Sequence, residues 1–389
     1  MKKLIAWMLA LMLCGGALAE GAAVPGNDLG FKVLARLADG SKNQFVSPVS
    51  LAYALSMAAA GAQGETRSEL LAALGVEDAA DIVAMNEALR ESGLSLANAA
   101  FVQNVLTLQP GYEAALKRFE ARCFPLDGLD EVNDWAREHT NGLIDPLLSD
   151  LDPQTRLLLV NAVAMDAEWW RKFDAEDTRE GDFHAPDGDI RVDFMHQLYE
   201  YADYGEIDGM QVLTLGYRDS DMAMTLALPK EGALADALAA LAERGMAALE
   251  VQPMDCRVYL ALPRLDISVT NLLSGALQAL GVRLAFTDIA DFSGISDRPL
   301  KIDEVLQKLR VQVDEEGTKA AAVTVVMMTD GAAADVEEPV RPLVRMILDR
   351  PFIMVISDSR TGAVAFAGVV AAPEAEDLGD REPETPDWW

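Results

Sequence analysis

The sequence predicts an α+β fold, because helical and strand-like segments are largely separated along the chain. Apolar residues recur at helical spacing from Ser47 to Gly75, where Ser47 suits a helix cap and Pro48 a first helical position. Apolar and β-branched runs, typical of buried strands, predominate later in the chain. Half of the residues are hydrophobic, which is enough to bury a large core.

Each segment has its own signal. The sequence "GAQGET" divides the run at residues 47–75 into two helices, and a cluster of turn residues, "SDSRTG", divides residues 351–370 into a hairpin. The other predicted helices cover residues 111–123, 131–139, 233–244 and 269–280. The other predicted strands cover residues 157–165, 222–228, 257–262 and 305–313.

The N-terminus has the pattern of a Sec signal peptide. Two lysines precede a short apolar run, and Ala17-Leu18-Ala19 predicts cleavage after residue 19. Residues 20–27 are then a linker, and the protein is secreted. The alternative is a lipoprotein anchored through Cys14, although Leu13 stands where such a signal needs a small residue.

The charge of the chain excludes several classes of partner. The net charge of −31 becomes −33 when Lys2 and Lys3 are removed with the signal peptide. Nucleic acid, heparin-like polyanions and anionic membranes would be repelled. Residues 374–389, "EAEDLGDREPETPDWW", are predicted to be a disordered acidic tail. Cys123 and Cys256 leave either one disulfide or two free thiols open.

The residue patterns of common enzymes are missing. The three histidines are scattered, and neither G-x-S-x-G nor H-E-x-x-H occurs. We therefore expect no catalytic residues, no metal and no cofactor.

The segment "DEEGTKAAAVTVVMMTDGAAADVEEP", residues 314–339, combines features of a strand and a loop. Nine small or β-prone residues, 320–328, lie between charged and turn residues. Alternation from Thr318 puts Thr318, Ala320 and Ala322 on one face and Lys319 and Ala321 on the other. The first face is small and uncharged, so it could enter a sheet without burying a charge.

Several stretches, in order, resemble one family, the serpins. They include "NQFVSPVSLAYALSMAAAGAQGET", "VNDWAREHTNGLIDPLL", "TRLLLVNAVAMDAEWWRKF", "VQVDEEGTKAAA" and "DRPFIMVISDSRTGAVAFAGVV", and the resemblance spans residues 28–373 as a single domain. It implies three sheets, about nine helices and a reactive loop at about residues 315–346. It also implies a monomeric, non-enzymatic inhibitor that traps a serine protease as a covalent acyl-enzyme when the cut loop inserts into the central sheet. The alternative is a non-inhibitory member, either a carrier protein or a plain protease substrate.

The resemblance also assigns roles to individual residues. It implies a loop hinge, a polar cluster under the central sheet called the shutter, and a tryptophan at the breach, where insertion begins. Gln307 stands where many relatives have a histidine, so pH sensitivity from that histidine is not expected. The hinge residues are Glu315, Gly317, Thr318, Ala320, Ala321 and Ala322; the shutter residues are Ser47, Ser50, Asn161 and Gln307; the breach residue is Trp169.

Two counts place the reactive bond differently. Counting forward from Gly317 by the family's spacing puts the cut between Gly331 and Ala332, whereas counting back from Pro351 puts it near Val340 and Arg341. A strand of fourteen residues spans roughly 45 Å, and the later cut would add roughly 30 Å of slack. We therefore predict the Gly331–Ala332 bond. A small residue at the cut suits elastase- or subtilisin-like serine proteases, but glycine fills such a pocket poorly, so Met328, Asp330 and Ala332 are the alternative positions.

The long far side of the loop, from Ala332 to Met346, is predicted to be a solvated extension, because Pro339 and Pro342 discourage strand pairing. Alternatively, Arg341 or Arg345 contacts the target protease.

Overall fold

The fold is taken from a computed structural model that describes residues 24–83, 89, 94–103, 106–140, 142, 145–151, 155–318 and 341–373, without the side chains of residues 95, 96, 161, 162 and 164. Several predicted features therefore lie outside the described residues. They are the signal peptide, Cys14, the acidic tail, the hinge residues Ala320, Ala321 and Ala322, and the Gly331–Ala332 bond.

The predicted helices near the N-terminus are confirmed. Ser47 caps α2, since its hydroxyl oxygen accepts a hydrogen bond from the Ser50 amide, and Pro48 begins the helix. In the described part of the chain, none of the helices is long and apolar enough to cross a membrane. The helices are α1 (Asn27–Leu37), α2 (Pro48–Gly61), α3 (Gly64–Leu74), α5 (Pro110–Arg118), α6 (Leu129–His139), α7 (Leu234–Arg244) and α8 (Ser274–Ala279).

The described strands form four hydrogen-bonded groups, the last two of which together make up a third sheet. One has the order β1 (Gln44–Val46), β17 (Val364–Val370), β16 (Phe352–Asp358), β10 (Met222–Pro229), β9 (Met210–Gly216) and β8 (Asp203–Ile207). A second has the order β15 (Leu343–Ile347), β11 (Arg257–Pro263), β7 (Gly188–Tyr199) and β6 (Arg179–Ala185).

The third sheet, called the central sheet below, consists of two hydrogen-bonded groups. One is β12 (Leu265–Leu272), β13 (Leu306–Val313), β14 (Gly317–Thr318) and β5 (Ala167–Glu168). The other is β3 (Arg122–Pro125), β2 (Leu94–Val102) and β4 (Leu157–Met165). Because a single residue, Asp166, separates β4 from β5, these two strands connect both groups.

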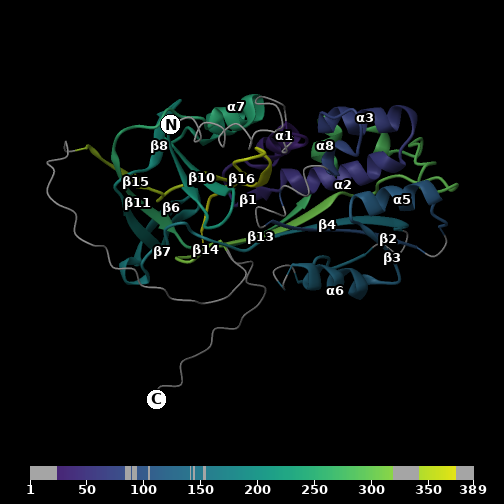
Figure 1. Cartoon of the computed structure of the whole chain (residues 1–389), viewed down its shortest axis with the longest axis horizontal. Coiled ribbons are helices and arrows are strands. Elements are labelled where there is room, and N and C mark those ends of the chain that lie inside the picture. The colour runs from purple at the N-terminus through teal and green to yellow at the C-terminus, as the bar shows by residue number, and fades with distance from the viewer. Residues whose placement is uncertain are drawn as a thin grey trace, which may run out of the picture.

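The central sheet is buried on both faces over β2 and β4. In Figure 1, α2 lies on one side of these strands and α6 on the other. Leu94, Val163 and Met165 belong to the main core, which includes α2, whereas Phe101 and Val160 pack with Trp135 of α6. Such double burial explains why residues 157–165 form a nearly continuous apolar run.

The prediction of a helix at residues 269–280 is wrong for residues 269–272. Leu265–Leu272 is strand β12, paired along its whole length with β13, and the helix is limited to Ser274–Ala279. Ile267, Val269 and Thr270 are β-branched, and pairing with β13 decides their conformation. The helix predicted at 111–123 likewise ends at Arg118, and Arg122–Pro125 is strand β3.

Candidate functional site

The residues predicted to form the hinge, called the hinge below, begin in a tight turn after β13. The Asp314 carboxylate accepts hydrogen bonds from the amides of Glu316 and Gly317 at 2.8 and 3.2 Å. The Asp314 amide donates in turn to the Gly317 carbonyl at 3.0 Å. This turn reverses the chain, so that Thr318 pairs antiparallel with Val313 of β13.

The first two residues after the turn form the short strand β14, which lies between β13 and β5. Gly317 pairs with Glu168 and Thr318 with Ala167. A Cβ atom on Gly317 would lie 2.0 Å from the Ala167 carbonyl oxygen and 2.8 Å from the Glu168 Cα atom. Only glycine fits this close approach of two backbones.

Thr318 is buried and faces the core. Its hydroxyl group lies 2.6 Å from the hydroxyl of Tyr217, whose ring stacks on Trp169 at 4.7 Å between centroids. Burial raises the pKa of Tyr217, so the phenol stays protonated and can share this hydrogen bond. The hinge strand is therefore anchored by a side chain as well as by its backbone.

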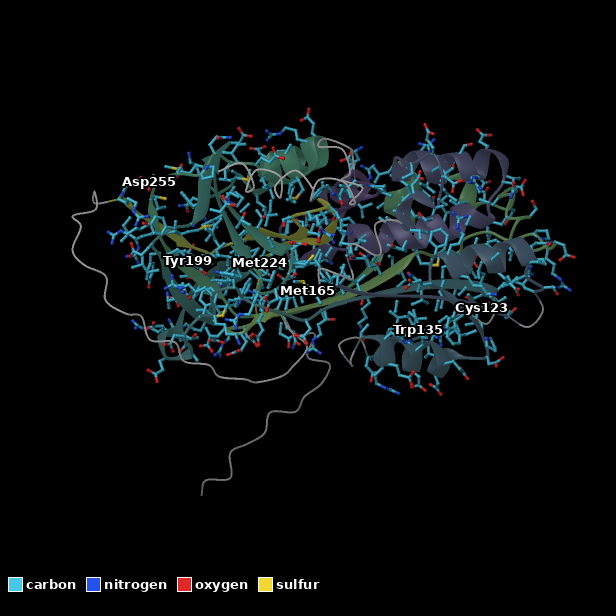
Figure 2. All side chains as sticks on the ribbon, viewed as in Figure 1. Cys123, Trp135, Met165, Tyr199, Met224 and Asp255 are labelled. Atoms are coloured by element: carbon cyan, nitrogen blue, oxygen red, sulfur yellow. The ribbon has the colours of Figure 1, made fainter. Side chains whose placement is uncertain are left out.

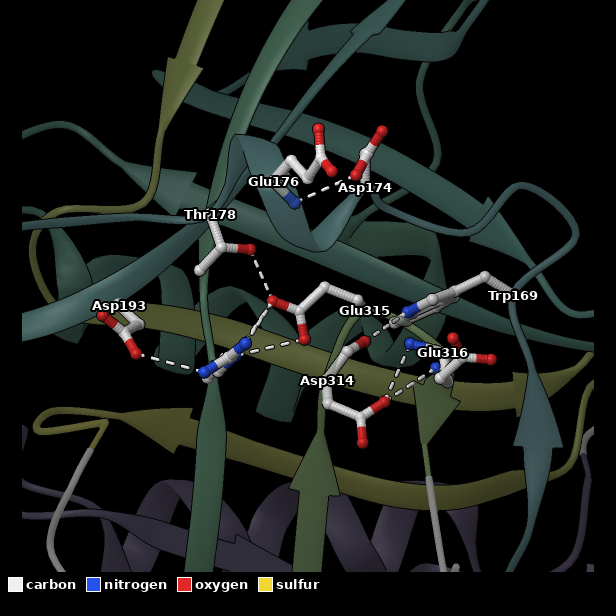
Figure 3. Close-up of polar contacts among 10 residues, drawn as sticks. Trp169, Asp174, Glu176, Thr178, Asp193, Asp314, Glu315 and Glu316 are labelled. Carbon is white, nitrogen blue, oxygen red and sulfur yellow. Dashed lines mark hydrogen bonds and ion pairs between the residues drawn. The ribbon is translucent and has the colours of Figure 1, made fainter. Parts of the chain in front are cut away.

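Trp169 holds the turn through two hydrogen bonds. Its indole N–H donates to the Asp314 carbonyl at 2.9 Å, and its amide donates to the Glu316 carbonyl at 2.9 Å. Figure 3 shows the indole beside Asp314 and Glu316. The tryptophan predicted at the breach thus contacts the hinge directly.

Glu315 is a buried carboxylate with several charged and polar partners (Figure 3). Arg264 donates from Nε at 2.9 and 3.1 Å and from Nη2 at 2.7 Å, and the Thr178 hydroxyl also donates. Arg264 in turn pairs with Asp193 at 3.1 Å. Burial raises the pKa of Glu315, but the hydrogen bonds from Arg264 and Thr178 outweigh burial and hold this pKa below its usual range.

Lys172 adds a second ion pair at the hinge. Its ammonium group contacts Glu316 at 2.5 Å and Glu168 of β5 at 3.0 Å. Sequence reasoning missed Thr178, Lys172, Tyr217 and Arg264, because each lies more than 50 residues from the hinge and no local motif marks it.

Three of the predicted shutter residues come together. Gln307 binds the backbone of Ser47 with both ends of its amide: its Oε1 accepts from the Ser47 amide at 2.9 Å, and its Nε2 donates to the Ser47 carbonyl at 3.0 Å. Ser50 joins through its amide, at 3.2 Å from the Ser47 hydroxyl. Asn161 lies in β4 opposite Asn98, and its side chain is outside the described atoms.

A second amide strengthens the same attachment. Asn271 of β12 accepts from Gln44 at 2.5 Å and donates to the Phe45 carbonyl at 2.6 Å. Together with Gln307, it fastens β12 and β13 to β1 and to the start of α2. These buried side chains therefore fix one side of the central sheet.

Below β14, the two sides of the central sheet are in contact between β4 and β13, but no backbone ladder joins them. Within the described residues, β4 pairs only with β2, and β13 pairs with β12 and, at Val313, with β14. A cavity of about 340 Å³ lies between the starts of β4 and β13, against α2. Its apolar lining includes Leu55, Ala58, Leu157, Leu158, Leu159, Ile295, Val305 and Leu306.

The far end of the loop returns to the body earlier than predicted. Leu343–Ile347 is strand β15, which pairs parallel with β11, so the loop does not extend to Met346. Arg341 donates to the Glu200 carbonyl at 2.6 Å and lies 3.9 Å over the ring of Tyr201. The prediction of a solvated extension from Ala332 to Met346 is therefore wrong from Arg341 onward. Arg341 contacts the body, and the chain pairs with β11 directly after Pro342.

The remaining polar candidates have structural partners. His139 stacks on Trp135, His184 pairs with Asp189, and His196 contacts Tyr259. Among the described residues, no group of His, Cys, Asp and Glu side chains could hold a metal ion. Cys123 and Cys256 are both free, which settles the choice between a disulfide and two thiols.

The comparisons with known proteins agree on one family. The model of the Serpin (serine protease inhibitor) family matches residues 25–373. An uncharacterized serpin-like protein from Thermococcus kodakarensis is 34% identical over 369 residues, which cover 90% of this chain and 85% of that protein. The native structure of Tengpin, a thermophilic serpin, has a TM-score of 0.78 at 28% identity and covers 89% of this chain and 93% of Tengpin. Thyroxine-binding globulin in complex with thyroxine has a TM-score of 0.76 at 27% identity and covers 90% and 98% of the two chains. The chain belongs to the serpin family.

Proposed function

We propose that the protein is an irreversible inhibitor of serine proteases, with elastase- and subtilisin-like enzymes as the favoured targets. One observation carries the proposal. The start of the loop, β14, is already hydrogen-bonded between β13 and β5, and β4 and β13 below it share no ladder. A cut loop can continue this strand downward by parting β4 from β13. The apolar side chains of the cavity between the starts of these two strands would then line the lower end of its path.

The register of β14 defines the path of insertion. Each residue added after Thr318 lies opposite the preceding residue of β13 and of β4, since both pairings are antiparallel. Ala320 would lie between Val311 and Met165, and Ala322 between Leu309 and Val163. All four neighbours are buried, so this face of the loop must be small and uncharged, as it is.

The same register brings the middle of the loop to the shutter. Thr324 would lie between Gln307 and Asn161, where a hydroxyl group can both donate and accept hydrogen bonds. Met328 would lie opposite Leu157, the first residue of β4. Thr324, the polar residue in the middle of the inward face, would thus lie at the polar shutter of the central sheet.

The length of β4 also favours the earlier reactive bond. Gly331 would lie three residues beyond Met328, just past the end of the sheet, so an attached protease would be pulled tight against the body. A cut after Arg341 would leave ten more residues, roughly 30 Å of slack. Moreover, Arg341 is bound to Glu200 and Tyr201 of the body.

In the proposed reaction, the serine hydroxyl of the protease attacks the Gly331 carbonyl carbon. The bond to the Ala332 nitrogen breaks, this nitrogen leaves as an amine with the proton from the serine, and an ester joins the protease to Gly331. Insertion then moves the protease to the far end of the sheet before water hydrolyses the ester. The energy comes from completing the central sheet, since the uncut protein holds it open.

A carrier function is the second candidate, because thyroxine-binding globulin shares the fold. Incubation with pancreatic elastase, chymotrypsin and subtilisin separates the two. An inhibitor gives an SDS-resistant complex with at least one of them, and mass spectrometry of the released peptide should place its N-terminus at Ala332. Loop cleavage without a complex would favour the carrier or a plain substrate.

We further propose that the protein is secreted after cleavage behind Ala19. N-terminal sequencing of the exported protein should then begin at Glu20. A lipid-modified N-terminal Cys14 would contradict this proposal.

A further inference from the structure

Two aromatic side chains are exposed at the end of the molecule where the loop leaves and returns. Trp170 is 70% exposed and Tyr201 is 72% exposed, whereas the neighbouring Trp169 and Tyr217 are buried. In Figure 2, Tyr199 marks this end, together with Asp255, opposite the end that carries Cys123 and Trp135. Large aromatic groups exposed in this way are typical of interaction surfaces.

These side chains line a groove of about 280 Å³, called the aromatic groove below. It lies between the two ends of the loop, called its anchors. At the first anchor, the Trp169 amide donates to the Glu316 carbonyl, and Trp170 is the next residue along the chain. At the second, the Arg341 guanidinium lies over the ring of Tyr201. The lining residues are Trp169, Trp170, Arg171, Tyr199, Tyr201, Ala202, Asp203, Leu213, Thr214, Leu215 and Gly216.

The aromatic groove is held in place by its own contacts. Arg341 lies 3.9 Å over the Tyr201 ring, Arg171 lies 5.6 Å over the Tyr199 ring, and the Trp170 amide donates to the Gly216 carbonyl at 3.0 Å. A preordered surface loses little entropy on binding. Trp, Tyr and Arg are also the residues most often found at binding hot spots.

We propose that the aromatic groove is a docking site for the target protease, outside the protease's active site. This proposal rests on the proposed function. A protease that holds the loop stands between the two anchors, and the groove is the surface that lies there. The groove suits an apolar or aromatic side chain of the protease, flanked by a carboxylate that pairs with Arg171.

The test uses Trp170→Ala, with Trp170→Phe as the conservative variant. Ile289→Ala is the matched control, because Ile289 is 77% exposed and follows η3 (Leu284–Phe286), which packs against α3 and not near the loop. The association rate constant, the stoichiometry of inhibition and the melting temperature are measured with pancreatic elastase, chymotrypsin and subtilisin. For at least one protease that the wild type traps, Trp170→Ala should lower the association rate about tenfold, Trp170→Phe should restore part of it, and Ile289→Ala should not change it. Stoichiometry and melting temperature should stay at wild-type values, because loop insertion is untouched.

Three results would overturn the proposal. If Trp170→Ala associates within twofold of wild type with every protease that the wild type traps, the groove is not a docking site, although the inhibitory function stands. If the variant changes the stoichiometry and not the rate, Trp170 acts on insertion. If the wild type is a dimer in light scattering and Trp170→Ala is a monomer, the groove binds a second copy. Failure of the wild type to trap any protease refutes the proposed function itself and is seen without any variant.

Discussion

Replacing Gly317 with alanine tests whether β14 must sit between β13 and β5. The new Cβ atom would lie 2.0 Å from the Ala167 carbonyl oxygen, and real Cβ contacts are essentially never below 3.0 Å. The neighbouring atoms belong to the backbone of β5, so no side chain can rotate away. β14 must therefore shift by about 1 Å or leave the sheet.

The expected cost follows from the contacts that such a shift breaks. They are the pairing of β14 with β5, the bond from the Trp169 amide to the Glu316 carbonyl, and the bond between Thr318 and Tyr217. At about 1 kcal/mol net for each buried hydrogen bond, losing two or three costs about 2–3 kcal/mol. If half of this appears in the transition state of insertion, insertion slows roughly tenfold.

The assay is the stoichiometry of inhibition with a protease that the wild type traps, together with the melting temperature. Slower insertion gives water more time to hydrolyse the ester, so more of the Gly317→Ala variant should be released as cleaved inhibitor. Gly275→Ala, in α8 and far along the chain from the hinge, is the control: a Cβ atom there would meet nothing within 4 Å, and its φ is not in the left-handed region. Wild-type stoichiometry and melting temperature for Gly317→Ala would refute this account of the hinge.

Three further predictions concern the loop and its anchors. Ala322→Glu would bury a charge beside the core and should convert the inhibitor into a substrate, whereas Ala321→Glu, one residue earlier and on the opposite face, should keep inhibition; equal stoichiometries would disprove the proposed register. Glu315→Gln should lower the melting temperature at neutral pH, and its difference from wild type should shrink as the pH falls below about 4.3. The reason is that a carboxyl whose pKa is lowered by folding stabilises the protein only while it is ionised. A pH-independent difference in melting temperature would contradict this reason. Trp169→Phe keeps a ring against Tyr217 but removes the indole donor to Asp314, so unfolding in urea should show a loss of about 1–2 kcal/mol; an unchanged midpoint would mean that this bond is not stabilising.

Much of the fold could be predicted from the sequence where the local signal and the tertiary environment agree. The strand at residues 157–165 and the helix that begins at Pro48 are examples, since continuous burial and an N-cap mark them locally. The prediction for residues 269–272 was wrong because their apolar pattern suits a helix, whereas hydrogen bonds to β13 make them a strand. The strand Leu343–Ile347 was not predicted, because Pro339 and Pro342 nearby argue against a strand. Parallel pairing with β11 nevertheless makes this segment a strand.

For the site, the sequence could indicate the hinge residues themselves but not the distant residues that contact them. Gly317, Thr318 and Trp169 could be named from the resemblance to the serpins, and the structure places all three together. Their partners could not be named, because Arg264 and Tyr217 reach the hinge from distant strands. The steric reason for Gly317 also appears only when the β5 backbone lies against it.

The most direct test of the central claim is hydrogen exchange of the backbone amides in β4 and β13 before and after loop cleavage. If the cut loop becomes a strand between them, amides of both strands that exchange quickly in the uncut protein should become protected, and the melting temperature should rise sharply. If cleavage after Gly331 leaves the exchange of β4 and β13 and the melting temperature unchanged, the loop does not insert and the protein does not inhibit by this mechanism.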